Sequence, residues 1–300
     1  MTLRLHHVAI NTPDPAATAA FYRQAADLDA VDADADDTAT WLAGPNFYVA
    51  LHQAQSGQTP PEKRVCDPGI GHFCLQSGDG NGLWQRLADG GMAFNDKPVA
   101  LGTGAIYAYG RDADATLIEV EGVPTADPQT PIWFAHIALV TPDIEALSDF
   151  YARLIGRDPH RTGRFDNPLF SNVTGMADVD VSAAWIKTPS IQLEMWQYHH
   201  PPTGAATPPQ NGATGYRRVG FCCKDIEAER KRLEGAGIAV EDGENIAGHP
   251  TLWTRDPDGN RVAIIEVADA SKLALDRLSD PDVVARRLAA WDKQREAARS

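Results

Sequence analysis

The chain of 300 residues contains only four cysteines, and none of them forms a CxxC pair. A disulfide framework and a cysteine-based zinc motif are therefore excluded, and the sparse thiols favour a reducing compartment. No uninterrupted apolar run approaches the length of a membrane-spanning helix. The opening residues, MTLRLHHVAI, lack the apolar core of a secretory signal, so we expect a cytoplasmic protein without a membrane partner.

Basic residues are also scarce. The chain has 27 Lys and Arg against 41 Asp and Glu, which gives a formal net charge of −14. This balance argues against nucleic acid and anionic membranes as partners. The hydrophobic fraction of 43% is that of a globular protein, and the length predicts two domains.

The chain contains an internal repeat. The segment HVAINTPD, beginning at His7, returns 129 residues later as HIALVTPD, beginning at His136. A second pair of segments, HFCL at His72 and RVGF at Arg218, is separated by 146 residues. Repeats at fixed spacing indicate a duplicated structural unit. The sequence therefore divides into four modules, at residues 3–53, 69–122, 133–198 and 215–268.

Each module has the same pattern. A β-branched strand is followed by a Pro/Asp turn, an amphipathic helix and three further strand-like runs, which predicts βαβββ. The fold class is therefore α+β. We expect consecutive modules to pair into two domains, residues 1–125 and 132–269, followed by a helical C-terminal tail at 270–300.

The modules resemble the vicinal oxygen chelate superfamily of glyoxalases, bleomycin resistance proteins and extradiol dioxygenases. The resemblance covers residues 3–268 and rests on the paired HxA(I/L)xxPD starts and on the RDAD turn ahead of Glu119. It implies that two βαβββ modules form one open, cup-like barrel with a metal ion inside. A homo-oligomer is a further expectation from the family.

Two neutral imidazoles and one carboxylate on one face suit Fe(II), with Mn(II) as an alternative. In residues 1–125 the matching family positions are His7, His72 and Glu119, which we predict to be the metal ligands. Strand alternation places Glu121 on the same face as Glu119, but the spacing from the RDAD turn favours Glu119. His6, next to His7, is expected on the opposite face.

Residues 132–269 match this ligand set poorly. Their corresponding positions are His136, Arg218 and Ala263. Arginine cannot be deprotonated to bind a metal, and alanine has no donor atom. Glu194 is present in a matching strand, but the other ligands of that domain are missing. The second domain is therefore predicted to be a degenerate copy.

The resemblance also distinguishes branches of the family. Glyoxalases and epimerases add a fourth acidic ligand, whose position in the first module falls on Ala50. A three-ligand site resembles that of type I extradiol dioxygenases, which implies catalytic roles for His52 as acid/base and for Tyr109 as a substrate-binding phenol. The family's second active-site histidine is replaced by Ala100.

We therefore predict an Fe(II)-dependent extradiol-type dioxygenase that cleaves a catechol-like aromatic diol with dioxygen. Two alternatives remain open. One is a metal-dependent isomerase or lyase that uses the ion as a Lewis acid and needs no oxygen. The other is a non-catalytic protein that binds a small molecule.

Overall fold

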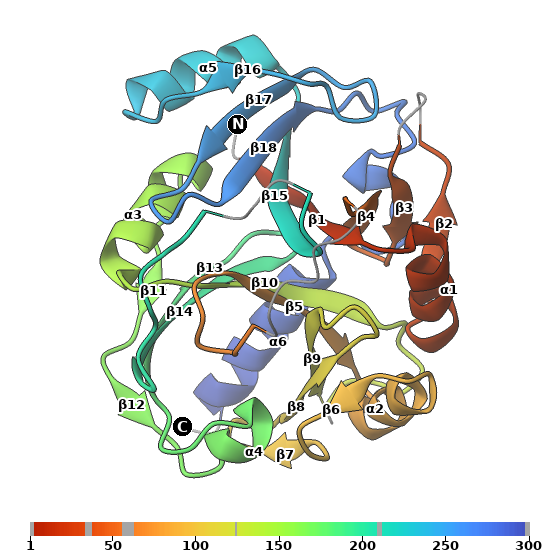
Figure 1. Cartoon of the computed structure of the whole chain (residues 1–300), viewed down its shortest axis with the longest axis vertical. Helices are drawn as coiled ribbons and strands as arrows, with labels where there is room; N and C mark the ends of the chain where they lie inside the picture. Colours follow the sequence, from red (N-terminus) through yellow and green to blue (C-terminus); the bar gives the residue numbers. More distant parts are fainter. Residues whose placement is uncertain (1–2, 34–37, 56–62, 124, 209–211, 298–300) are drawn as a thin grey trace.

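A computed structural model describes residues 3–33, 38–55, 63–123, 125–208 and 212–297, with side chains described up to residue 290. The predicted α+β class is confirmed, because the strands form two mixed sheets and the helices pack on them (Figure 1). No helix in the described ranges is long and apolar enough to cross a membrane.

Sheet A is built from the first and fourth modules and fills the upper half of Figure 1. Its strands from the first module are β1 (Arg4–Thr12), β2 (Asp29–Val31), β3 (Thr40–Ala43) and β4 (Tyr48–Gln53). Those from the fourth module are β15 (Gly215–Cys223), β16 (Glu241–Asp242), β17 (Thr251–Arg255) and β18 (Arg261–Glu266). The modules meet where β1 runs antiparallel to β15, and the strand order is β16-β17-β18-β15-β1-β4-β3-β2.

Sheet B is built from the second and third modules and fills the lower half of Figure 1. The second module gives β5 (Gly69–Ser77), β6 (Ala93–Phe94), β7 (Val99–Ala100), β8 (Ile106–Arg111) and β9 (Leu117–Gly122). The third gives β10 (Trp133–Val140), β11 (His160–Arg161), β12 (Phe165–Asp166), β13 (Asp180–Ile186) and β14 (Gln192–His200). Antiparallel pairing of β5 with β10 joins the modules, in the order β11-β13-β14-β10-β5-β9-β8-β6.

This arrangement differs from the expected pairing of consecutive modules. Residues 1–125 contribute one module to each sheet, and so do residues 132–269. The pairing of the first strands determines which modules share a sheet. β1 pairs antiparallel with β15 rather than with β5, and β5 pairs with β10. A site inside either sheet therefore combines residues from both halves of the chain.

The main helices follow the first strand of each module, as predicted. They are α1 (Pro15–Ala25), α2 (Gly80–Asp89), α3 (Ile144–Ile155) and α5 (Ile226–Gly235). Each begins after an aspartate whose side chain accepts hydrogen bonds from backbone N–H groups of the first turn: Asp14, Asp79, Asp143 and Asp225. The repeated aspartate is thus a helix N-cap, which stabilises a helix by about 1 kcal/mol.

The RDAD turn has a structural role. Asp112 Oδ1 accepts hydrogen bonds from the backbone N–H groups of Asp114 and Thr116, which close the turn between β8 and β9. Its Oδ2 accepts a hydrogen bond of 2.7 Å from the hydroxyl of Tyr22 on α1. The turn therefore connects sheet B to a helix of sheet A.

A single large core joins the two sheets. It contains one face of β1, β5, β10 and β15 together with the buried sides of the four main helices. The opposite faces carry separate clusters, one on each sheet. On sheet A this cluster includes Leu273, Ala274 and Leu275, which belong to the segment after β18 and to the short 3-10 helix η1 (Leu275–Arg277).

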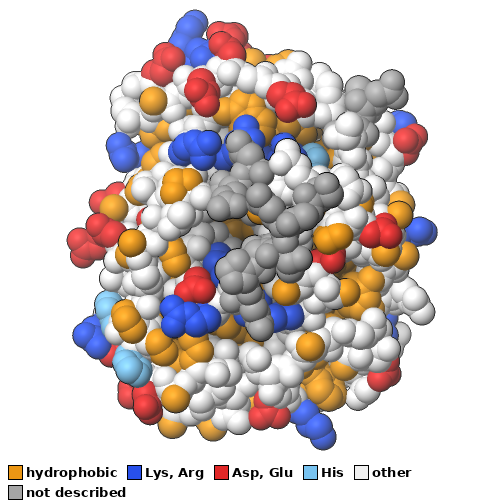
Figure 2. All heavy atoms as spheres, viewed as in Figure 1, with side chains coloured by type: hydrophobic (Ala, Val, Ile, Leu, Met, Phe, Trp, Pro, Cys, Tyr) orange, Lys and Arg blue, Asp and Glu red, His pale blue; other side chains and the backbone are white. Residues whose placement is uncertain are grey.

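The C-terminal tail continues into helix α6 (Val283–Ala297), which crosses behind sheet B in Figure 1. Val283 and Val284 are buried against Trp133 of β10, and Arg287 stacks over the same ring at 4.7 Å. The tail thus contacts both sheets. Acidic and basic side chains are interspersed on the face shown in Figure 2.

Candidate metal centre

Four neighbouring strands of sheet B direct donor side chains to one point. These strands are β14, β10, β5 and β9, and the side chains are Glu194, His136, His72 and Glu119. In the third module, β10 and β14 are parallel, and Ala138, two residues after His136, lies opposite Glu194. In the second module, β5 and β9 are parallel, and Cys74, two residues after His72, lies opposite Glu119. The two modules therefore supply one histidine and one glutamate each.

The donor atoms are close and buried. His136 Nε2 lies 2.7 Å from Glu119 Oε2 and 3.1 Å from Glu194 Oε2, and 3.2 Å from His72 Nε2. His72 Nε2 lies 3.2 Å from Glu119 Oε2. The four residues are 2–7% exposed, and each offers one donor atom within 4.8 Å of the others.

These residues fit a divalent metal ion. Glu119 Oε2 is buried and makes no hydrogen bond of ordinary geometry among the described residues, although two imidazole nitrogens lie within 3.2 Å of it. The four donor atoms therefore converge on a common point. Two imidazoles and two carboxylates are hard and borderline ligands, which suit Ni²⁺, Co²⁺, Zn²⁺, Fe²⁺ or Mn²⁺.

A tryptophan supports one of the carboxylates. Trp185 on β13 donates a hydrogen bond of 2.6 Å from Nε1 to Glu194 Oε1. This bond leaves Glu194 Oε2 directed at the two histidines. Such outer hydrogen bonds fix the orientation of a metal ligand and are part of the site.

The electrostatics of the cluster agree with a cation site. Burial alone would lower the pKa of His136, but Glu194 and Glu119 outweigh it and raise the pKa to about 9. Burial would raise the pKa of Glu119, whereas His136 and His72 lower it. Without metal, a protonated imidazole lies between two carboxylates, and a metal ion would displace that proton.

The predicted ligand His7 lies elsewhere, on sheet A. Its Nε2 accepts a hydrogen bond of 3.2 Å from Arg218 Nε, and Arg218 Nη1 lies 3.1 Å from Nε2 of His52. The ring of His7 packs directly over Gly220, where a Cβ atom would meet it at 2.0 Å. The grouping of His7 with His72 and Glu119 is therefore wrong, because β1 pairs with β15 instead of β5.

Sheet A cannot reproduce the metal set. Its equivalent positions hold His7, Arg218, Ala50 and Ala263, which include a permanent positive charge and two side chains without donors. Burial and then Arg218 lower the pKa of His52 to about 3, so this imidazole stays neutral. His52 is thus separated from the donor set of sheet B, contrary to the role expected for it.

His6 also differs from expectation. A register shift between Leu5 and His7 turns both histidine rings to one face, where their Nδ1 atoms lie 3.0 Å apart. His6 Nε2 donates a hydrogen bond of 2.7 Å to the carbonyl of Leu273, and the hydroxyl of Tyr48 donates to the carbonyl of Ala274 at 3.1 Å. The segment after β18 therefore covers the face of sheet A that corresponds to the metal face of sheet B.

Tyr109 lies with the donor set, on β8 next to β9. Its ring centroid is 4.9 Å from that of His72, and the residue is 6% exposed. Burial and the neighbouring Glu119 raise the pKa of Tyr109, so its hydroxyl remains a neutral hydrogen-bond donor. Three of the five predicted site residues, His72, Glu119 and Tyr109, are thus brought together.

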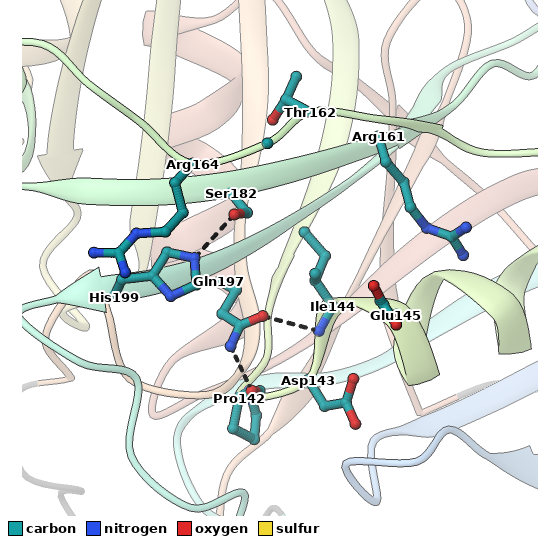
Figure 3. Close-up of a pocket in the computed structure, with 11 residues that line it drawn as sticks. Pro142, Asp143, Ile144, Glu145, Arg161, Thr162, Arg164, Ser182, Gln197 and His199 are labelled. Carbon is teal, nitrogen blue, oxygen red and sulfur yellow. Dashed lines mark hydrogen bonds between the residues drawn. The ribbon is translucent and has the colours of Figure 1, made fainter.

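A surface pocket of about 510 Å³ opens on the opposite face of β13 and β14, beside the first turn of α3 (Figure 3). Its polar groups bond to one another. Ser182 Oγ and His199 Nε2 lie 2.9 Å apart, and Gln197 accepts from the N–H of Ile144 and donates to the carbonyl of Pro142. Strand alternation directs Ser182 and Gln197 away from Glu194, so the pocket is separate from the donor set.

Sequence comparison agrees with the fold. Two family models described as the glyoxalase/bleomycin resistance protein/dioxygenase superfamily match residues 4–120 and 135–252. The chain belongs to the vicinal oxygen chelate superfamily. A comparison with curated protein sequences finds no match.

Two solved structures of this vicinal oxygen chelate fold illustrate the similarity. Glyoxalase I from Zea mays superposes with a TM-score of 0.61 at 20% identity, over 88% of this chain and 92% of that one. A candidate dioxygenase from Bacillus subtilis superposes with a TM-score of 0.63 at 13% identity, over 94% of this chain and 90% of that one. At these identities the likeness shows a shared fold only.

Sequence reasoning misses His136 and Glu194 as members of the set. Both residues stand at family positions, but the lack of donors at Arg218 and Ala263 assigns them to a degenerate domain. The signal that could have found them is the count of donors for each pairing of modules. Only the second and third modules together supply two histidines and two glutamates.

Proposed function

We propose that this vicinal oxygen chelate protein is a divalent-metal-dependent isomerase or lyase that acts on a small carbonyl compound with two adjacent oxygen atoms. The observation that carries the proposal is Glu194, whose Oε2 lies 3.1 Å from His136 Nε2 and adds a fourth donor. In the family resemblance, a fourth acidic ligand belongs to the glyoxalase and epimerase branches. A three-ligand site belongs to the dioxygenases.

A divalent ion held by His72, Glu119, His136 and Glu194 would act as a Lewis acid toward both substrate oxygens and lower the cost of removing a proton from the neighbouring carbon. Glu119 is proposed to take this proton once a bound ion has displaced the proton of His136, whose charge lowers the pKa of Glu119 in the metal-free site. Trp185 already donates a hydrogen bond to Glu194, which fixes the orientation of that carboxylate. Glu119 Oε2 makes no such hydrogen bond among the described residues.

Tyr109 is proposed to position the substrate. Its neutral hydroxyl can donate a hydrogen bond to a substrate oxygen beside His72, since the two rings are in contact.

The test uses metal-free protein reconstituted under nitrogen with Ni²⁺, Co²⁺, Zn²⁺ or Fe²⁺. The loaded protein is incubated in D₂O with 2-oxoaldehydes, with and without a small thiol, and NMR follows deuterium exchange and isomerisation. We expect metal-dependent exchange without oxygen consumption, lost in Glu119→Gln and His136→Ala and retained in His7→Ala. Metal-loaded protein that exchanges no proton in any of these compounds would contradict the proposal.

Extradiol ring cleavage with Fe(II) or Mn(II) is the second candidate. His72, His136 and Glu119 alone form a two-imidazole, one-carboxylate set, and Tyr109 lies beside it. The acid/base residue expected from the resemblance, His52, lies beside Arg218 instead. Oxygen uptake by the Fe(II)-loaded protein with a panel of catechols, coupled to a coloured product, would favour this candidate over the isomerase.

A further inference from the structure

A second group of side chains of metal-ligating types lies two residues further along β5 and β9. It consists of Cys74 on β5, Glu121 on β9 and His136 on β10, all buried and with donor atoms within 4.8 Å of one another. Cys74 follows His72 by two residues, and Glu121 follows Glu119 by two. Strand alternation therefore keeps this inner group on the same face as the four-donor set.

Hydrogen bonds from outside orient the inner group. Gln76 Nε2 donates to Glu121 Oε2, and Trp133 Nε1 donates to Gln76 Oε1 at 2.7 Å. Trp133 is in turn covered by Arg287 of α6. The Sγ atom of Cys74 lies 3.9 Å from Glu121 Oε2. In metal sites the ligating carboxylates are themselves held by hydrogen bonds from neighbouring side chains.

We propose that Cys74, Glu121 and His136 form a second metal position that takes a thiophilic divalent cation such as Zn²⁺ or Cd²⁺. A thiolate, a carboxylate and an imidazole make a softer donor set than two imidazoles and two carboxylates. On binding, the S–H bond of Cys74 breaks, an S–metal bond forms and the proton leaves to solvent. This position goes beyond the proposed function, which uses only the four-donor set.

The two positions share His136. A cation in the inner group therefore competes with an ion in the four-donor set for the same imidazole. Since the donor atoms of both groups lie within 4.8 Å of His136, simultaneous full occupation would place two divalent charges close together. A thiophilic cation is thus expected to weaken binding of Ni²⁺ to the four-donor set.

The test is a titration of the full-length, metal-free protein with Cd²⁺, followed by the ultraviolet charge-transfer absorption of a cadmium–thiolate bond. We expect this absorption in the wild type, its loss in Cys74→Ser and its retention in the control Cys222→Ser, whose cysteine lies on β15 of sheet A. Glu121→Gln, which preserves the cysteine, is expected to weaken Cd²⁺ binding at least tenfold. Circular dichroism establishes that each variant is folded.

Absence of thiolate absorption in the wild type, or equal absorption in folded Cys74→Ser, would overturn the proposal. Failure of the inner metal position can be distinguished from failure of the proposed function, because Glu119→Gln removes a donor of the four-donor set and leaves the inner group intact. If wild-type protein shows the cadmium–thiolate signal but no proton exchange with Ni²⁺, the inner position stands and the isomerase proposal falls. Proton exchange without the thiolate signal would instead support the isomerase proposal and overturn the inner position.

Discussion

The Nε2 atoms of His72 and His136 lie 3.2 Å apart, although 64 residues separate them along the chain. They belong to β5 and β10, the antiparallel strands that join the second module to the third. The candidate metal centre is therefore built across the boundary between the two sequence halves. Both this centre and the contacts around it can be tested without a known substrate.

One Ni²⁺ ion is expected per chain, because only sheet B offers four donors among the described residues. His72→Ala and His136→Ala should each reduce binding strongly, since each removes an imidazole from the set. His7→Ala is the matched control, because His7 lies beside Arg218 on sheet A. Isothermal titration and metal analysis measure the stoichiometry, and two ions per chain or loss of binding in His7→Ala would contradict the assignment.

Trp185→Phe should weaken metal binding by roughly 10–100-fold, the usual effect of losing an outer hydrogen bond to a ligand. The substitution removes the Nε1–H that donates to Glu194 Oε1 and keeps a flat aromatic ring. The control is Trp196→Phe. The ring centroids of Trp185 and Trp196 are 5.9 Å apart, and the buried Nε1 of Trp196 makes no hydrogen bond among the described residues. Equal affinities of the two variants would show that the hydrogen bond does not support the site.

Acid should destabilise the protein between pH 6.5 and 4 in part through His6. Burial lowers the pKa of His6 from 6.5 to about 4. The unfolded chain therefore takes up the proton first as the pH falls, and stability that is full above pH 6.5 decreases toward pH 4 by roughly 3 kcal/mol. Urea unfolding at pH 7 and pH 4 should show a smaller loss in His6→Gln than in the wild type. Equal losses would mean that His6 is not the group responsible.

Tyr22→Phe should lower the free energy of unfolding by about 1–3 kcal/mol, because Asp112 Oδ2 loses its buried donor. The corresponding pair in the other half is Tyr151 and Asp256, where the Tyr151 hydroxyl donates a hydrogen bond of 3.1 Å to Asp256 Oδ2. There Asn260 Nδ2 also donates to Asp256 Oδ2 at 2.9 Å, so Tyr151→Phe should cost less. Urea denaturation of both variants provides the comparison, and the opposite order would contradict this explanation.

The local features of the fold could be predicted from the sequence. Alternation of apolar residues, the Pro/Asp turns and the N-cap aspartates are decided by neighbouring residues, so the α+β class and the repeated module follow from them. His72 and Glu119 are also grouped correctly, because β5 and β9 are parallel neighbours within one module. Tyr109 on β8 follows for the same reason.

The pairing of modules could not be predicted in this way. All four first strands are similar in length and pattern, so alternation shows which side chains share a face but not which strand lies alongside. The positions of His7 and His52 depend on that choice, and the assignment of Glu194 to a degenerate domain does as well. Hydrogen bonds between β1 and β15 and between β5 and β10 decide it, and these contacts are remote in the sequence.

The interleaved sheets also have a consequence for how the chain reaches its native state. β5 and β10 can pair while the ribosome is still adding later residues, but the outer edge of β1 has no partner until β15 has been made. The first module therefore carries an exposed strand edge through most of synthesis, and such an edge is where premature association with other chains begins. For the same reason, a cut between the two halves would leave each fragment with two open edges, so that only co-expression of both fragments would restore the protein.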